Sequence, residues 1–78
     1  MTMKTATLQY IRTVLIENTY KEANAQYKAG KLLEELKKNG ADNELIRKQK
    51  EEYEIAQMAY KIAQEALEEF ENQEWSEK

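Results

Sequence analysis

The sequence predicts an all-α protein, an antiparallel two-helix hairpin that assembles as a homodimeric four-helix bundle. Three observations lead to this prediction. Apolar residues recur at three- and four-residue steps through both halves of the chain, which is the helical period. A single break, at residues 39–42, separates two segments of similar length. Pro is absent, Gly occurs twice, and 35% of the residues are charged, mainly Lys and Glu, which are good helix formers.

The first helix is predicted over residues 5–38. Met1 to Thr5 are expected to fray, and Thr5 and Thr7 both fit the N-cap position. Gly30 costs about 1 kcal/mol relative to Ala inside a helix, which indicates a weak point or a close backbone contact. A heptad-like row predicts the buried seam, which consists of Leu8, Ile11, Leu15, Asn18, Glu22, Ala25, Ala29, Leu32 and Leu36.

The turn is predicted at residues 39–42. Gly40 suits the left-handed position that follows a helix C-terminus. Lys37 and Lys38 place positive charge in the last turn of the first helix, where the helix dipole favours it. Asp42 is a suitable N-cap for the next helix. One short turn therefore ends one helix and begins the other.

The second helix is predicted over residues 43–74 and has the wider apolar surface. Its apolar residues cover about half of the circumference, more than the stripe of roughly 100° that is typical of a surface helix. A central row of small residues lets a partner backbone come close, so this helix is expected to contact more than one neighbour. The central row is Ala56, Ala59, Ala63, Ala66 and Phe70, and the flanking rows are Tyr53, Tyr60 and Leu67, and Ile55, Met58 and Ile62.

Matched helix lengths and a short turn predict antiparallel pairing within the chain. Residues 1–38 carry seven Lys/Arg and four Asp/Glu, whereas residues 39–78 carry five and eleven. Opposite net charges favour the pairing, although each exposed pair contributes little. The expected register pairs Ile11 with Phe70, Arg12 with Glu69, and Glu34 with Arg47.

A chain of 78 residues forms one domain that is too small to bury all of these apolar rows. Without Cys, no disulfide can staple it. Self-association is the remaining way to cover the surplus, and a dimeric four-helix bundle is the simplest form. The residues expected at the oligomer interface are Leu15, Tyr27, Ala56, Ala59, Tyr60, Ala63 and Phe70.

Residue types for catalysis and metal binding are scarce. The chain has no Cys and no His, and Ser76 is its one Ser, which excludes a Ser or Cys nucleophile with a His base. Glu65 and Glu68 have the spacing of a di-metal carboxylate motif, but no His completes it. We therefore expect a non-enzymatic protein without metal or cofactor that acts by binding itself and another protein.

No window approaches the roughly 20 apolar residues of a membrane span, and the N-terminus shows no signal-peptide pattern. A cytoplasmic location without a membrane partner is the expectation.

Asn18 and Glu22 interrupt the predicted seam. The preferred interpretation is that the seam drifts and both residues face solvent. The alternatives are a buried polar layer that fixes the oligomer, or a ligand pocket at a dimer interface. Most of the five Tyr residues are expected to pack at interfaces, where a ring with one polar end is favoured. The candidate ligand-binding residues are Arg12, Asn18, Tyr20, Lys21, Glu22 and Tyr27.

The short length, the composition rich in Lys, Glu and Asn, and the plain hairpin resemble small phage or prophage proteins in general type. That resemblance implies a regulator or inhibitor of host machinery. Some small helical phage proteins instead form oligomers that sequester nucleotide signals. In architecture alone the dimeric hairpin is similar to Rop-type RNA-binding proteins, and Lys21 and Lys28 share a helical face that RNA would contact. A ligand-sequestering or Rop-like RNA-binding bundle is therefore the alternative to a protein-binding regulator.

Overall fold

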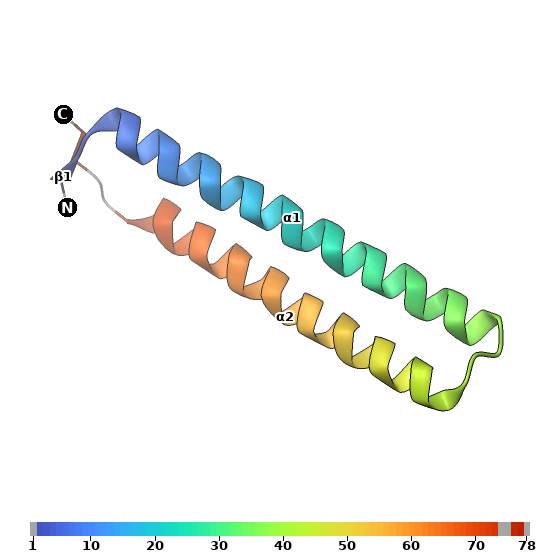
Figure 1. Ribbon diagram of the computed structural model, residues 1–78. Coiled ribbons are helices and arrows are strands. Elements are labelled where there is room, and N and C mark those ends of the chain that lie inside the picture. Colours follow the sequence, from blue (N-terminus) through green and yellow to red (C-terminus); the bar gives the residue numbers. More distant parts are fainter. Residues whose placement is uncertain (1, 74–75, 78) are drawn as a thin grey trace.

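The computed structural model describes residues 2–73 and 76–77 and contains two long antiparallel helices joined by a short loop (Figure 1). Helix α1 spans Thr5–Lys38 and helix α2 spans Asn43–Asn72. Along the chain, a short strand β1 (Thr2–Met3) precedes α1, and a short strand β2 (Ser76–Glu77) follows α2. The Cα atoms extend over 59 × 14 × 12 Å, so the helices form a single layer. The predicted helical hairpin is confirmed, and α1 has its predicted bounds.

Helix α2 ends before residue 74, where the sequence analysis placed its end. Gln73 has extended backbone angles, with φ −73° and ψ 144°, and its N–H donates to the carbonyl of Phe70 at 3.3 Å. Residue 74 itself lies outside the described residues.

The strands β1 and β2 pair in parallel at the end of the hairpin opposite the loop (Figure 1). Thr2 pairs with Ser76, and Met3 pairs with Glu77. The sequence analysis expected only frayed residues before the first helix, so this contact is an addition to the predicted fold. Segments of two residues are too short to show the alternation that marks a strand, and no sequence pattern predicted them.

The loop after α1 is a Schellman motif, as the position of Gly40 predicted. Gly40 has a φ of 68°, in the left-handed region. Its N–H donates to the carbonyl of Lys37 at 3.3 Å, and the N–H of Ala41 donates to the carbonyl of Leu36 at 2.9 Å. These two hydrogen bonds satisfy carbonyl groups that have no partner inside the helix.

The sequence predicted the start of α2 correctly but not the N-cap of α1. Lys4, and not Thr5 or Thr7, is the N-cap of α1, and Asp42 is the N-cap of α2 as predicted. Neither N-cap side chain makes a capping hydrogen bond. Their carbonyl groups accept the first helical N–H groups, each at 3.0 Å. The prediction of a threonine cap was wrong, because Thr5 and Thr7 already lie within the first turn of α1.

The small-residue face of α2 packs against α1, as the apolar pattern predicted. Ala63 is 3% exposed and Phe70 is 8% exposed, whereas the row formed by Ile55, Met58 and Ile62 stays outside. The residues of α2 that lie toward α1 keep a heptad spacing along the whole helix. They are Ile46, Gln49, Tyr53, Ala56, Tyr60, Ala63, Leu67 and Phe70.

From Asn18 onward, every second member of the predicted α1 seam is displaced by one residue. The other members stay half-buried on the seam, and they are Leu15, Glu22, Ala29 and Leu36. Two adjacent rows of α1 contain apolar and small residues, so the periodicity alone did not decide between them. The row that includes Gly30 fits the large rings of α2 and is the one that packs inward. Asn18, Ala25 and Leu32 are therefore exposed, and Thr19, Gln26 and Leu33 take their places.

Polar side chains on the seam fix the register of the two helices. The Thr19 hydroxyl donates to the carbonyl of Leu15 at 2.9 Å and lies 3.5 Å from the carbonyl of Ala63. The Gln49 amide, only 7% exposed, donates from Nε2 to the carbonyl of Ala29 at 3.1 Å. Because a buried amide without a partner is costly, this hydrogen bond penalises any sliding of one helix along the other.

Arg12 makes an ion pair between the helices, but with a different carboxylate from the one expected. Its Nε lies 2.8 Å from Oε1 of Glu71, and its guanidinium carbon lies 5.9 Å from the centre of the Phe70 ring. The predicted partner was Glu69. Arg12 thus lies over the Phe70 ring and reaches the carboxylate two residues beyond the predicted one.

The predicted pairing of Glu34 with Arg47 is also wrong. Arg47 pairs with Glu44 and Glu51 on its own helix, at three- and four-residue spacings. The hydrogen bond to Glu44, with the charge of Glu51, raises the pKa of Arg47. Carboxylates three and four residues away on the same helix lie next to Arg47, so it pairs with them and not with a carboxylate of the other helix.

We predict that Gly40→Ala lowers the free energy of unfolding by about 1 kcal/mol, since a Cβ is disfavoured at positive φ. No other atom lies within 4 Å of a Cβ built at this position, so sterics with neighbours do not contribute. Gly40→Asn is the matched control and should cost less, because Asn tolerates the left-handed region. Urea unfolding of both variants measures the difference, and equal losses would contradict this account of the loop.

Candidate functional site

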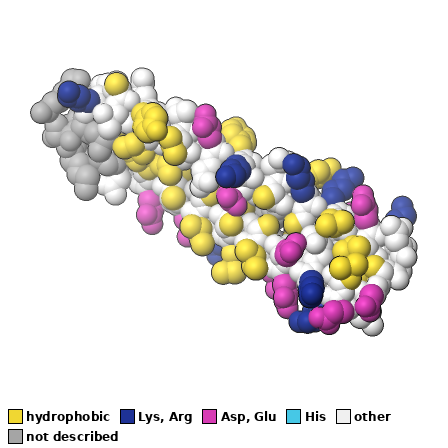
Figure 2. Space-filling view, in the orientation of Figure 1, with side chains coloured by type: hydrophobic (Ala, Val, Ile, Leu, Met, Phe, Trp, Pro, Cys, Tyr) yellow, Lys and Arg dark blue, Asp and Glu magenta, His cyan; other side chains and the backbone are white. Residues whose placement is uncertain are grey.

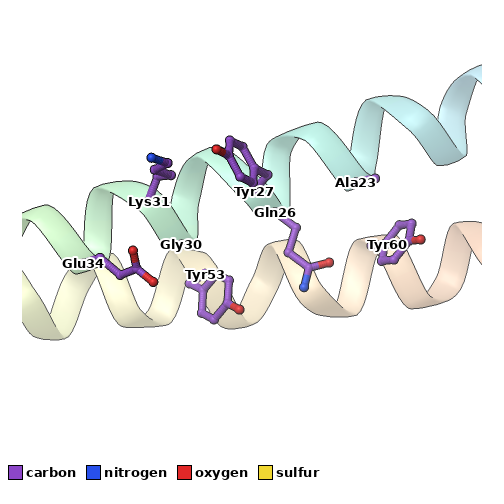
Figure 3. A pocket seen from close by; sticks show the side chains of 8 residues that line it. All are labelled: Ala23, Gln26, Tyr27, Gly30, Lys31, Glu34, Tyr53 and Tyr60. Carbon is purple, nitrogen blue, oxygen red and sulfur yellow. The ribbon is translucent and has the colours of Figure 1, made fainter.

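A groove lined by tyrosines runs between the two helices on one face of the hairpin (Figure 3). Its volume is about 390 Å³. Helix α1 contributes small and polar residues, and α2 contributes two aromatic rings. We call this site the tyrosine groove, and it is lined by Ala23, Gln26, Tyr27, Gly30, Lys31, Glu34, Tyr53 and Tyr60.

The groove depends on the absence of a side chain at Gly30. A Cβ built on Gly30 would lie 3.0 Å from Cε1 of Tyr53, closer than ordinary van der Waals contact. The Tyr53 ring therefore lies directly against the α1 backbone. Of the two alternatives that the sequence analysis left open at Gly30, a weak point or a close backbone contact, the structure shows the close contact. A glycine therefore has a packing reason here despite its low helix propensity.

The groove combines aromatic surface with a few polar groups. Gln26 reaches from α1 toward α2 between Tyr53 and Tyr60, while Tyr27 and Lys31 lie on the outer edge of α1 (Figure 3). The Lys31 ammonium lies 5.9 Å from the centre of the Tyr27 ring, which is within cation–π range. The groove offers rings and hydrogen-bonding groups to a ligand, and its lining contains no cluster of one charge.

The second open surface lies on the opposite face of the hairpin. On α2, Ile55 and Ile62 follow the groove residues Tyr53 and Tyr60 by two residues, which is about 200° around a helix. On α1, Leu32 follows the groove residue Gly30 in the same way. The opposite sides of α1 and α2 therefore share the other face. We call this surface the aliphatic flank, and its exposed members are Val14 (44%), Leu32 (45%), Leu45 (50%), Ile55 (65%) and Ile62 (62%).

Exposed apolar side chains are thus not scattered singly on this molecule. Met58, at 63% exposure, borders the aliphatic flank, and Tyr10 and Tyr20 are exposed by more than 70% on α1. On the face drawn in Figure 2, hydrophobic side chains reach the surface in patches along the hairpin, between charged ones. Contiguous exposed apolar patches mark interaction sites in folded proteins.

The residues predicted for an oligomer interface are mostly covered within one chain. Ala63 and Phe70 are buried between α1 and α2, and Leu15, Ala56, Ala59 and Tyr60 are half-buried there. Only Tyr27, at 64% exposure, keeps most of its surface. The residues with surface left for a second copy are instead those of the aliphatic flank.

The six predicted ligand-binding residues do not meet at one site. Of these, Tyr27 alone lines the tyrosine groove. Asn18 is exposed, as the preferred interpretation held, but Glu22 is half-buried on the seam. Arg12 is paired with Glu71, and Tyr20 and Lys21 point to solvent on different sides of α1.

The sequence analysis missed most of the groove, although a signal for it was present. Tyr53 and Tyr60 lie one heptad apart, and so do Ala23 and Gly30. Two large residues at this spacing on one helix, opposite two small ones on the other, predict that rings pack over a glycine–alanine floor. The one-residue error in the seam of α1 hid this match.

Within residues 2–73 and 76–77, no group of three Asp or Glu side chains has the arrangement of a metal site. Neither helix contains a stretch long and apolar enough to cross a membrane.

We predict that Gly30→Ala raises the free energy of unfolding by about 1 kcal/mol in a Tyr53→Ala background, from helix propensity alone. In the wild-type background the gain should be clearly smaller, because the new Cβ presses on the Tyr53 ring. Urea unfolding of the four chains gives the coupling between the two positions. Equal gains in the two backgrounds would show that the ring does not restrict position 30.

No protein-family model matches the chain, and no curated protein or solved structure matches it either. The tyrosine groove and the aliphatic flank are therefore the features from which a function can be inferred.

Proposed function

We propose that this protein is a non-catalytic binding protein that works as a homodimer. In this proposal a second copy covers the aliphatic flank and completes a four-helix bundle, while the tyrosine groove stays open for a partner protein. The observation that carries the proposal is the exposure of the large aliphatic side chains of Ile55 and Ile62, by 65% and 62%, on a helix whose opposite side is already packed.

The surface area supports self-association. The hairpin exposes 6199 Å², whereas a compact monomer of 9.2 kDa exposes about 4,900 Å². The surplus of about 1,300 Å² is larger than the roughly 800 Å² that each partner contributes to a standard stable interface. A second layer of helices, docked on one face of the single-layer hairpin, would cover this excess of exposed surface.

The character of the groove favours a protein partner. Tyrosines bury large area with little loss of side-chain entropy and are enriched at protein interfaces. Lys31 and Glu34 place one positive and one negative charge at the groove, so the site does not select for phosphate. Helix α2 carries four Lys/Arg and eight Asp/Glu, which opposes a polyanion.

A binding role is also supported by the chemistry that the chain lacks. Its 78 residues include neither Cys nor His, so the common nucleophile–base pairs cannot form. A small protein with binding surfaces and no catalytic pair acts by occupying or reshaping its partner. We therefore propose a regulator or inhibitor, in line with the small phage-type proteins that it resembles in general type.

Ile62→Glu should weaken self-association by about tenfold or more, since two new charges per dimer must enter an apolar interface. Gln57→Glu adds the same charge to the groove side of α2 and should leave the association unchanged. Sedimentation equilibrium at micromolar concentration measures both variants against the wild type. A wild-type protein that is monomeric and folded under these conditions would refute the proposal.

Tyr27→Ala should abolish capture of the partner protein from an extract of the native cells, because it removes one wall of the groove. Tyr20→Ala is the matched control, since Tyr20 is equally exposed but lies outside the groove. Apolar contacts should survive moderate salt, whereas nucleic-acid binding weakens by orders of magnitude. A captured species that is lost with salt and with nuclease would favour the RNA-binding alternative.

A further inference from the structure

We propose that the second copy docks on the aliphatic flank with the two-fold axis perpendicular to the helices. In this arrangement α1 packs on α1 of the second copy, α2 packs on α2, and the two loops lie at opposite ends of the bundle. The inference rests on the proposed self-association and adds to it the face that is used and the polarity of the two copies.

The aliphatic flank of α1 is complementary to itself. A perpendicular two-fold axis brings each residue opposite the position that lies equally far on the other side of the axis. Val14 and Leu32 are the exposed aliphatic residues of this flank on α1, and Ala23 lies midway between them. An axis at the level of Ala23 therefore places Val14 of each copy against Leu32 of the other.

The aliphatic flank of α2 is complementary to itself in the same way. Ile55 and Ala66 are symmetric about a point between residues 60 and 61, and so are Ile62 and Ala59. An axis at this level places each exposed isoleucine against a half-buried alanine of the second copy. Large residues against small ones allow close packing of two helices.

The two helices place the axis at the same height. The contact of Gly30 with Tyr53 and the ion pair of Arg12 with Glu71 place Ala23 level with residue 60. The Thr19–Ala63 contact places it level with residue 59, and the Gln49–Ala29 hydrogen bond places it level with residue 55. By three of these four contacts, the axis levels found separately for α1 and α2 agree within two residues, or about 3 Å along the helices. One axis satisfies both halves of the interface.

The other way to stack two hairpins gives poor contacts. With the axis parallel to the helices, α1 lies on α2 of the second copy and both loops lie at the same end. Rotation about this axis leaves every residue at its own height along the helices, so the two copies cannot slide past each other to improve the contacts. Every large aliphatic residue of the central flank then lies level with a charged one. The pairs are Val14 with Glu69, Leu32 with Glu51, Ile55 with Lys28, and Ile62 with Lys21.

Net charge favours this second arrangement, but it is the weaker effect. Helix α1 carries six Lys/Arg and four Asp/Glu, and α2 carries four and eight. Exposed charges are screened by salt, and their pairs contribute little. In the proposed arrangement Glu52 comes level with Glu69 of the second copy. Both follow the three- and four-residue spacing of the Ile55–Ala66 row, so each glutamate pair lies at an end of this row. Burial of the isoleucines outweighs these terms.

Distances between spin labels distinguish the two arrangements, and the absence of Cys makes single-cysteine labelling specific. A label on Lys38→Cys, at the loop end of α1, should lie about 45 Å from its copy if the axis passes at Ala23. A distance below about 25 Å would place the loops together and overturn the inference, while self-association would stand.

Asn24→Cys is the control, because this position lies next to the axis level and gives a short distance in both arrangements. If this label shows no coupling to a second copy, the protein does not self-associate, and both the inference and the proposed function fail.

A double-mutant cycle with two introduced charges tests whether the aliphatic flank is the dimer interface. Val14→Lys and Leu32→Glu should each weaken the dimer about tenfold, and the double variant should bind at least threefold more tightly than the product of the two effects predicts. The two positions lie 18 residues apart on one helix, so this coupling arises only between copies. The absence of coupling would overturn the proposed interface.

Discussion

The contact of two tyrosine rings with the small residues of α1 decides how the helices face each other. Tyr53 and Tyr60 are too large to oppose ordinary seam residues at the distance of packed helices. They fit where Gly30 and Ala23 leave the α1 backbone open, and Gly30 has room for no more than its hydrogen atoms beside the Tyr53 ring. The displacement of the α1 seam, the tyrosine groove and the position of the aliphatic flank all follow from this fit.

Few side chains are buried between the two helices. Among the described residues, only Leu8, Leu33, Ala63 and Phe70 form a buried apolar core, together with the amide of Gln49. Small residues bring the helices close, but they remove little apolar surface from water, and hydrophobic stabilisation scales with that area. The Schellman loop at one end and the paired strands at the other hold the hairpin closed, and a second layer of helices would supply the burial that one layer lacks.

Much of the fold was predictable because its signals are local. The helical period, the lysines of the last turn and the glycine of the loop depend on neighbouring residues alone, and they gave the bounds of α1 and the loop correctly. The phase of α1 was not predictable in the same way, since two adjacent rows were apolar and only the tyrosines of the other helix decide between them. The Lys4 cap and the strand pair involve backbone groups, which leave no trace in the choice of side chains.

The candidate site likewise contains residues that could be predicted from the sequence and residues that could not. Tyr27 was identified because it lies near Asn18 and Glu22 in the sequence and because tyrosine is favoured at interfaces, whereas Gln26 and Lys31 look like ordinary surface residues until the groove is seen. Ion pairs were the least predictable feature, because Arg12 and Arg47 each had several carboxylates in reach and small shifts of the helices decided among them.

The placement of the groove and the aliphatic flank on opposite faces sets the valency of the proposed dimer. When a second copy covers the flank, the two grooves face outward in opposite directions. A single compact partner then cannot occupy both, so the dimer gains no avidity on one molecule. It becomes a bridge that holds two partner molecules apart by the thickness of the bundle, and its effect depends on the ratio of dimer to partner.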